Sequence, residues 1–573
     1  MKKKPKTAYY LELNLGSRGP AGGSAVGFTP VRFKPDTELE TLRILKRAAG
    51  DKKLRGVLVN TSGFSGNKAF LWEIRNALEN CKSSGKKIIG YFESADMDLY
   101  CMLSAADKIV MDEGGTLSLM GYAWGKLFVK ESLDKIGVGF RELRYLDYKS
   151  ANEMFSRTSI SEADKEQYGL YLEEIFDLTK SIIISNRSSS EENFMALLNE
   201  SIFLAPNEAK ARNLVDAQGR REAIIKTIKA LEFGNVEESE KSGEVFFIST
   251  NPGISLFSLN RKMPGYSSGR VRKIRAPEIA VVHARGNTDL DQGMGARNIA
   301  KTIRELAEKS RVKALVVRID SPGGSAVAAD YVAEAIEEAK KEIPVVVSMG
   351  QVAASGGYWA AMYASHIIST PYTLTGSIGV IGGWFFDNGL NAKLGLGTES
   401  LSRGEHADLL TGVIFPKRDL RDDEEAQFRR TLLTLYGEFV KKAAKGRNKA
   451  SEDLESMAQG RVYSGLHAQQ LGLVDSLGGY LDALDTAKKL AEIPVSKKVL
   501  VREYPKPKFI ETITARFFAS SLANLRQSIA PGLMTAFAPF GSEKNAELAQ
   551  SLEDLQYRIS KNGQAMPILP LIS

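Results

Sequence analysis

Cysteine and histidine are scarce in this sequence, which limits the kinds of chemistry it can support. Two cysteines, Cys81 and Cys101, cannot provide a disulfide framework for 573 residues, and their separation matches no metal-binding motif. Four histidines leave little material for a mechanism that needs a histidine cluster. We therefore predict a protein without a bound metal or cofactor.

Long hydrophobic runs and a strong charge imbalance are also missing. No stretch of about 18 consecutive apolar residues is present, so we expect no membrane-spanning helix. The basic start, MKKKPKTAYY, passes directly into strand-like alternation, so we expect neither a secretory signal nor a transit peptide there. The 77 basic and 69 acidic residues give a net charge of +8. That excess is too small to indicate nucleic-acid binding, although it is compatible with contact to an anionic membrane surface.

The most informative feature is an internal repeat. When the sequence is shifted against itself by 258 residues (317 − 59 = 258), identical residues align over a long ungapped run. The aligned pairs include Val59 with Val317, Gly66 with Gly324, Ala95 with Ala353, Tyr100 with Tyr358, and Gly121 with Gly379. A period of this length indicates a whole domain used twice rather than a short solenoid unit.

Each copy is predicted to alternate strands with helices. The runs GVLVN (56–60) and ALVVRI (314–319) have the length and composition of buried parallel strands, and amphipathic stretches flank both. This order predicts α/β domains with right-handed crossovers. We predict the following organisation: an N-terminal copy at 1–234, a linker at 235–275, a C-terminal copy at 276–500 and a C-terminal arm at 501–573.

The predicted linker and arm differ in composition from the two copies. The linker is polar and rich in glycine, proline and serine. The arm contains an apolar, partly amphipathic stretch at 509–540. Two interpretations of this stretch stay open, a packing or oligomer contact and docking on a membrane surface.

Three glycine-rich motifs in the second copy follow predicted strands. SPGGS (321–325) can point consecutive backbone N–H groups into a cavity, which suits an oxyanion, although a plain strand-to-helix turn explains the same residues. Ser355 in ASGGYW (354–359) lies between a strand and a helix, where it is either an exposed nucleophile or an N-cap. Ser377 lies between glycines in a further turn.

The first copy lacks the serine but carries a candidate base. Met97 aligns with Ser355 (355 − 97 = 258). Lys149, in DYKSANEMF (147–155), aligns with Ala407 of the second copy (407 − 149 = 258). A lone lysine is usually a surface charge. The complementary loss nevertheless predicts that the two copies meet in one composite site.

A lysine can activate a serine hydroxyl when the amine is neutral. Burial destabilises the ammonium form and lowers the pKa of the amine, so a buried lysine can accept a proton near neutral pH. The side chains beside Lys149 are candidates for an apolar surrounding (Tyr145, Leu146, Tyr148). The competing base is His406, which directly precedes the residue aligned with Lys149.

The tandem copies, together with SPGG, ASGGYW, TGSIGV and YKSA, resemble the long, two-copy type of the signal peptide peptidase A family over nearly the whole chain. The resemblance implies a hydrolase, namely a serine peptidase with a Ser/Lys dyad on a Clp-protease/crotonase-like fold. It implies that Ser355 is the nucleophile, Lys149 the general base, and Ser377 the residue that holds the lysine toward the nucleophile. Gly324 and the backbone N–H of Ser355 are the implied oxyanion donors. A homotetramer with apolar grooves, which degrades cleaved signal peptides or other apolar peptides at or near a membrane, is implied as well.

Function and compartment both retain alternatives. A crotonase-like acyl-CoA enzyme would use the same glycines without a serine nucleophile, and a non-catalytic membrane-associated scaffold would use neither. Bacterial two-copy members usually carry an N-terminal anchor that is not seen here, whereas SISEADKEQY (159–168) is similar to plastid-type members. We expect membrane association without a transmembrane helix, with a plastid thylakoid or stroma, or the cytoplasm, as alternatives. Small residues around Ser355 and the apolar run at 380–386 predict apolar substrate side chains near the cleavage point.

Overall fold

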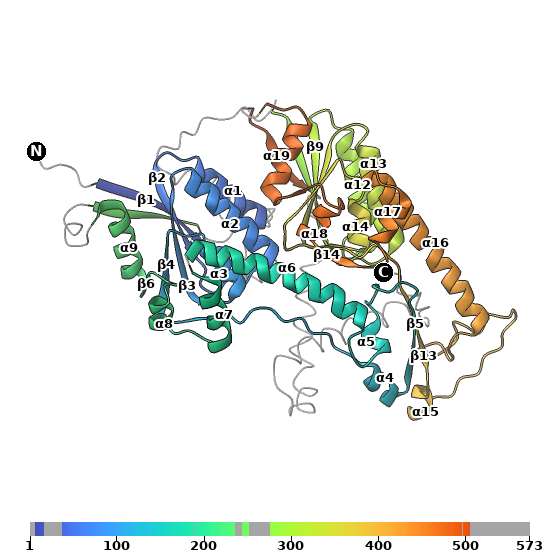
Figure 1. Cartoon of the computed structure of the whole chain (residues 1–573). Helices are drawn as coiled ribbons and strands as arrows, with labels where there is room; N and C mark the ends of the chain where they lie inside the picture. Colours follow the sequence, from blue (N-terminus) through green and yellow to red (C-terminus); the bar gives the residue numbers. More distant parts are fainter. Residues whose placement is uncertain are drawn as a thin grey trace, which may run out of the picture.

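Two mainly parallel β-sheets, one from each copy of the repeat, form the body of the protein (Figure 1). The computed structural model describes residues 6–16, 37–187, 189–234, 243–250, 276–494 and 497–504. The first sheet contains β1 (Lys6–Asn14), β2 (Leu54–Asn60), β3 (Lys87–Ala95), β4 (Lys108–Leu117), β6 (Ala217–Gln218) and β7 (Gly243–Thr250). The second contains β8 (Glu278–Arg285), β9 (Val312–Ser321), β10 (Val345–Ala354), β11 (His366–Ser369), β12 (Leu374–Gly376), β14 (Val462–Ser464), β15 (Ser476–Leu477) and β16 (Leu500–Tyr504).

The two sheets have corresponding strand orders. The first runs β6-β4-β3-β2-β1-β7, and the second runs β14-β12-β10-β9-β8-β16, with β11 paired to β10 and β15 paired to β11. The runs predicted as buried strands at 56–60 and 314–319 lie inside β2 and β9. The prediction of an α/β protein with two tandem, related domains is therefore confirmed.

Helices cover the sheets in both copies (Figure 1). Those of the first copy are α1 (Thr37–Ala49), α2 (Lys68–Ser83), α3 (Met97–Leu103), α7 (Glu191–Glu200), α8 (Pro206–Ala211) and α9 (Arg221–Phe233). Those of the second are α12 (Ala296–Ala307), α13 (Ala326–Ala339), α14 (Gly356–Ala361), α17 (Ser451–Ser456), α18 (Gly465–Gln470) and α19 (Tyr480–Leu490).

The domain boundaries differ from the sequence prediction at two places. Residues 243–250, which were expected in the linker, form β7, which pairs in parallel with β1 from Lys6↔Gly243 to Leu13↔Thr250. The prediction of a linker is wrong here. The strand is short and lies between two polar stretches, so the average composition of the region is that of a linker. The second sheet continues through β16 to Tyr504, beyond the predicted boundary at 500. The apolar stretch at 509–540 lies outside the described residues.

Each copy also has an arm outside its sheet, distinct from the C-terminal arm predicted at 501–573, and the two arms pair with each other. The first arm contains α4 (Lys130–Ile136), β5 (Val138–Leu143), α5 (Glu153–Ser156) and the long helix α6 (Glu162–Arg187). The second contains β13 (Gly382–Asp387), α15 (Leu390–Lys393) and α16 (Asp422–Arg447). Strand β5 pairs antiparallel with β13, from Val138↔Asp387 to Leu143↔Gly382. Figure 1 shows this ribbon beside the second copy, with α6 running from there back to the first sheet.

One hydrophobic core continues from the first copy into the second. Ile74 of α2 shares a buried cluster with Val316 of β9 and with Tyr480 of α19. At this junction Arg318 Nη2 donates to Glu73 Oε1 at 2.8 Å, and the two side chains are 2% and 1% exposed. Separating such a pair would leave a buried charge without its partner, which is strongly unfavourable. The ion pair therefore holds the two copies in one relative position.

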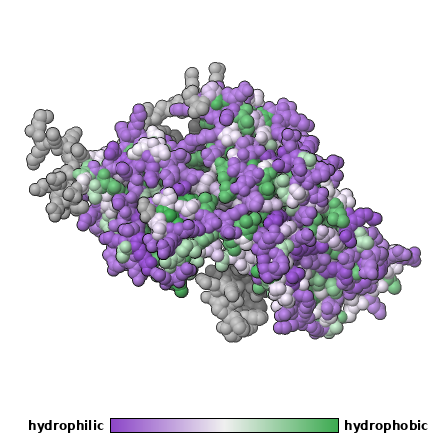
Figure 2. Space-filling model, in the orientation of Figure 1, coloured by the Kyte–Doolittle hydropathy of each residue, from purple (hydrophilic) through white to green (hydrophobic). Residues whose placement is uncertain are grey.

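The surface seen in Figure 2 is mainly hydrophilic, with hydrophobic residues in small, scattered patches. Among the residues that the structure describes, no helix has the length and apolar character required to cross a bilayer.

Candidate active site

Ser355 lies at the sharp turn between β10 and α14. Its backbone has φ 53° and ψ −119°, a left-handed conformation that costs a non-glycine residue about 1 kcal/mol or more. The turn is fixed because the Ser355 N–H donates to Gly376 O at 2.9 Å and the Trp359 N–H donates to Ser355 O at 2.9 Å. The Ser355 side chain forms no capping hydrogen bond, so the structure does not support the N-cap interpretation.

The SPGG loop packs against this turn through its glycines. A Cβ on Gly323, where φ is 109°, would lie 2.7 Å from Ser355 Cβ, so only glycine fits there. A Cβ on Gly356 would lie 3.3 Å from Gly324 N, which shows that these two glycine backbones border the same space. The backbone N–H of Ser355, predicted as an oxyanion donor, is already bonded to Gly376 O and is not free in this structure.

Lys149 reaches Ser355 from the arm of the first copy. Lys149 Nζ lies 2.8 Å from Ser355 Oγ and 3.0 Å from both Ser377 Oγ and Ser377 O. Lys149 is 3% exposed and Ser355 is 4% exposed. The three side chains that the sequence predicted for the site are therefore brought together, between the two copies.

The surroundings of Lys149 favour the neutral amine. Desolvation by burial lowers the pKa of Lys149 from its ordinary value to about 7, because the ammonium form loses its water. Near neutral pH a substantial fraction of the amine is therefore uncharged. An uncharged amine within hydrogen-bonding distance of a serine hydroxyl can accept its proton.

Gly460 allows the loop that carries Lys149 to approach the second copy. A Cβ on Gly460, where φ is 85°, would lie 2.5 Å from Lys149 Cβ. The same turn holds Ser377, since the Ser377 N–H donates to Arg461 O at 2.7 Å and the Gly460 N–H donates to Ile378 O at 2.9 Å. Sequence reasoning missed Gly460, because an isolated glycine does not reveal which segment packs against it.

The turn of the first copy that aligns with the Ser355 turn carries different residues. Met97 is the first residue of α3 and is buried, with Asp96 as the N-cap. Beside it, the side chain of Asp98 forms an ion pair with Lys68 and accepts a hydrogen bond from Tyr122. The first copy thus keeps the strand-to-helix turn but has methionine where the second copy has the candidate nucleophile.

His406, the competing base, lies elsewhere. Its Nδ1 is 3.0 Å from Glu424 Oε1 and 2.8 Å from Arg421 Nη2, at the start of α16. Ser355 Oγ instead has Lys149 as its side-chain partner. Within the described ranges, no group of three or more His, Cys, Asp or Glu side chains is suited to hold a metal ion.

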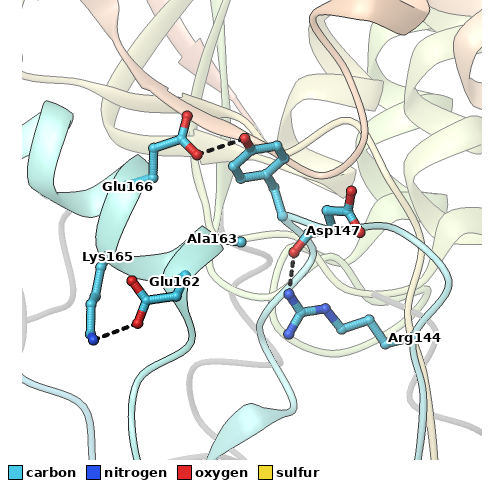
Figure 3. A pocket seen from close by; sticks show the side chains of 7 residues that line it. Arg144, Asp147, Glu162, Ala163, Lys165 and Glu166 are labelled. Carbon is cyan, nitrogen blue, oxygen red and sulfur yellow. Dashed lines mark hydrogen bonds and ion pairs between the residues drawn. The ribbon is translucent and has the colours of Figure 1, made fainter.

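A surface depression of about 690 Å³ exposes the loop that carries Lys149 and the first turns of α6 (Figure 3). It is lined by Arg144, Asp147, Tyr148, Glu162, Ala163, Lys165 and Glu166. Because neither Ser355 nor Lys149 lines it, this depression is not the place where a substrate meets the candidate nucleophile.

A strained serine turn, a glycine loop beside it and a buried amine are features of a serine hydrolase. The model of Peptidase family S49 matches residues 80–233 and 337–494, once in each copy. "Serine protease SPPA, chloroplastic" from Arabidopsis thaliana is 31% identical over 80% of this chain and 67% of that protein. "Putative signal peptide peptidase SppA" from Enterococcus faecium is 30% identical over 39% of this chain and 64% of that protein. A solved structure of ClpP1 from Listeria monocytogenes, 16% identical, covers 36% of this chain and 94% of its own, with a TM-score of 0.25.

The chain belongs to Peptidase family S49 and is a serine protease. The family model matches each copy separately, which agrees with the internal repeat found in the sequence.

Proposed function

We propose that this chain is an endopeptidase in which Ser355 is the nucleophile and Lys149 the general base. The observation that carries the proposal is the 2.8 Å contact between Lys149 Nζ and Ser355 Oγ in a buried site. Ser377 would orient the amine, because both its hydroxyl and its carbonyl oxygen lie 3.0 Å from Lys149 Nζ. When Lys149 is neutral and donates to Ser377, its lone pair is left for the Ser355 proton.

The proposed reaction proceeds through an acyl-enzyme. Lys149 Nζ accepts the hydroxyl proton while Ser355 Oγ attacks the peptide carbonyl carbon. The N–H groups of Gly324 and Gly356 would hold the resulting oxyanion, in place of the engaged N–H of Ser355. The Lys149 ammonium then gives its proton to the leaving nitrogen as the C–N bond breaks. Water, deprotonated by Lys149, hydrolyses the ester, and Ser355 regains its proton.

We propose apolar peptides, including cleaved signal peptides, as substrates. Support comes from the name of the Enterococcus relative and from a cluster of partly buried aromatic rings on the arms, one of which carries Lys149. The Phe140 and Phe385 rings lie 4.6 Å apart on the ribbon, and Phe155 of α5 lies 5.1 Å from Phe385. Peripheral membrane contact and the compartment remain predictions.

The proposed function can be tested with a fluorophosphonate probe, which reacts with activated serines. We expect the probe to label Ser355 and to block hydrolysis of apolar peptides from a mixed library. The Ser355→Ala variant should neither react nor cleave. Thioester hydrolysis that survives in Ser355→Ala would instead indicate the acyl-CoA enzyme, and a folded wild-type protein without labelling would indicate the scaffold.

We further propose a homotetramer. Within the chain, β5 of the first copy pairs with β13 of the second. The segments that match them by the repeat are 396–401 (138 + 258 = 396) and 124–129 (382 − 258 = 124), and neither is a strand. Both expose apolar side chains, with Leu127 70% and Leu401 fully exposed. Head-to-tail pairing of 396–401 with 124–129 of a second chain would repeat the ribbon and cover these side chains.

The number of four follows from the family resemblance, and light scattering of the purified chain should give four times the chain mass. Replacing Leu401 with Asp should lower that mass, because a charge would be placed in the proposed ribbon. A monomeric wild-type chain would contradict the proposal.

A further inference from the structure

The loop that carries Lys149 is held from outside through its backbone carbonyls. Gln167 of α6 donates from Nε2 to Tyr148 O at 3.0 Å. On the other side of the lysine, Lys126 Nζ donates to Ser150 O at 2.8 Å. The residues before and after Lys149 are thus fixed by two side chains from different elements, which restricts where its amine can lie.

Both holding side chains meet at the carboxylate of Asp164. Asp164 is completely buried (0% exposed) and accepts from Gln167 Nε2 at 2.8 Å and from Lys126 Nζ at 2.8 Å. It also accepts a hydrogen bond from the Ser150 hydroxyl. A buried carboxylate is stable only when its oxygen atoms are satisfied in this way. Asp164 therefore fixes its three partners relative to one another.

Gln167 also connects this loop to the second copy. Its Oε1 accepts from the Val462 N–H at 3.0 Å, and the side chain is 1% exposed. Val462 begins β14, and the preceding residue, Arg461, accepts the Ser377 N–H through its carbonyl oxygen. A single amide side chain thus links the segment of Lys149 to the segment of Ser377.

The ion pairs behind the loop match two positive side chains with two negative ones. Lys126 and Arg144 are positive, whereas Glu153 and Asp164 are negative and fully buried. Lys126 Nζ lies 2.8 Å from Asp164 and 3.3 Å from Glu153, and Arg144 is paired with Glu153. Glu142 lies near Arg144, Glu153 and Lys126, and burial raises the pKa of its carboxyl. Tyr168 of α6 is a further, partly buried neighbour of Asp164 and Glu153. The groups toward solvent are Asp147, Tyr148, Glu166 and Arg461, of which the last three form a bonded set.

We propose that Asp164 and Gln167 are positioning residues for the general base, and that Lys126 balances the charge of Asp164 beside it. This inference rests on the proposed function, because it requires Lys149 to be the base. The two residues belong to the SISEADKEQY segment, to which sequence reasoning assigned no chemical role.

The charge balance predicts opposite pH effects for two variants. Lys126→Met leaves one negative charge in excess, which stabilises the Lys149 ammonium and raises its pKa from about 7. The acidic limb of the pH–rate profile should then move upward by about 0.5–1.5 pH units. Asp164→Asn leaves one positive charge in excess and should move the limb downward. In the double variant the charge is balanced again, and the limb should return toward the wild-type position.

Gln167→Leu tests positioning without changing the charge. The substitution keeps the volume of the side chain but removes its hydrogen bonds to the loop and to β14. We expect kcat to fall by about 10- to 100-fold with KM nearly unchanged, because the amine is misplaced while substrate binding is untouched.

The repeat supplies matched controls. Helices α6 and α16 align with a shift of 260 (422 − 162 = 260), so Glu424 corresponds to Asp164 and Gln427 to Gln167. Glu424 is buried, like Asp164, and bonds His406 beside the alanine that replaces the lysine. Glu424→Gln is the matched control for Asp164→Asn, and Gln427→Leu, at an exposed position, controls for the change of side chain alone. Both should leave the acidic limb in its wild-type position.

The test measures the rate at which the fluorophosphonate labels Ser355 on the full chain from about pH 5 to 9. The fall of this rate at low pH defines the acidic limb. The melting temperature of each variant shows whether it is folded. Opposite shifts for Lys126→Met and Asp164→Asn, with none in the controls, are the expected result. The inference is wrong if the acidic limbs of folded Lys126→Met and Asp164→Asn shift in the same direction or do not shift. If Lys149→Ala is unreactive in that case, the proposed dyad is still supported. If Lys149→Ala still reacts, the proposed function itself fails. Should Asp164→Asn not fold, Lys126→Met and Gln167→Leu decide the matter.

Discussion

Replacing Lys149 with alanine is expected to lower kcat for peptide hydrolysis by about 10³-fold or more. Without the amine, the Ser355 proton has no acceptor, and Lys149 Nζ is the side-chain group bonded to Ser355 Oγ in this structure. Ser355→Ala should lower kcat by the same factor. The double variant should be no worse than either single one, because the two residues act as one unit. Steady-state kinetics on an apolar peptide checks all three.

The free energy of unfolding of Lys149→Ala, measured as a function of pH and compared with that of the wild type, shows whether the variant is folded. The pKa of Lys149 is lowered in the folded protein to about 7, so between that pH and the ordinary lysine value the unfolded chain binds more protons. The stability of the wild type should therefore rise with pH in this window, and the variant should lack that contribution. Near-normal kcat in Lys149→Ala would falsify the dyad.

Gly460→Ala is expected to lower kcat by about 10²-fold or more. The new Cβ would lie 2.5 Å from Lys149 Cβ and 2.7 Å from Lys149 Cα, so one of the two segments must move. Gly460 also has φ 85°, a conformation that disfavours alanine. Since the proposed role of Lys149 depends on a 2.8 Å contact between its Nζ and Ser355 Oγ, a displacement of the size of this overlap would separate the two atoms.

Gly437→Ala is the matched control for this substitution. Gly437 lies in α16, and apart from its chain neighbours and the backbone of its own helical turns, no atom lies within 4 Å of the position that its Cβ would occupy. Alanine in a helix is favourable by about 1 kcal/mol relative to glycine, so this variant should keep full activity with equal or higher melting temperature. Gly460→Ala with unchanged kcat would mean that the approach of the two segments does not matter for catalysis.

The repeat made the fold and two of the three central residues, Ser355 and Lys149, predictable, whereas the role of Ser377 was implied by the family resemblance. A shift of 258 aligned the strands of the two copies and showed Ser355 and Lys149 to be complementary, each present where the other copy has Met97 or Ala407. This comparison needs no knowledge of distances. It is valid because two copies of one fold place aligned residues at equivalent points.

The remaining parts of the site depend on contacts that sequence spacing does not record. The β5–β13 ribbon joins segments more than two hundred residues apart, and Gln167 meets Val462 across a similar separation. Asp164 and Gln167 lie on a helix in which most side chains are partly exposed, and this weakens the amphipathic signal. The Ser355 N–H was mistaken for a free donor, since its bond to Gly376 is also a contact between separate turns.

The strand-to-helix turns of the two copies carry different residues, and this sets the number of candidate active sites per chain. If Ser355 and Lys149 form the dyad, the two folded repeats of each chain provide one place where a peptide bond can be cut, because α3 begins with Met97 and the arm of the second copy carries Ala407. An assembly of this chain would then contain one such site for every two repeats. The turn of the first copy would then have no part in catalysis, so packing alone can determine the Lys68–Asp98 ion pair beside it.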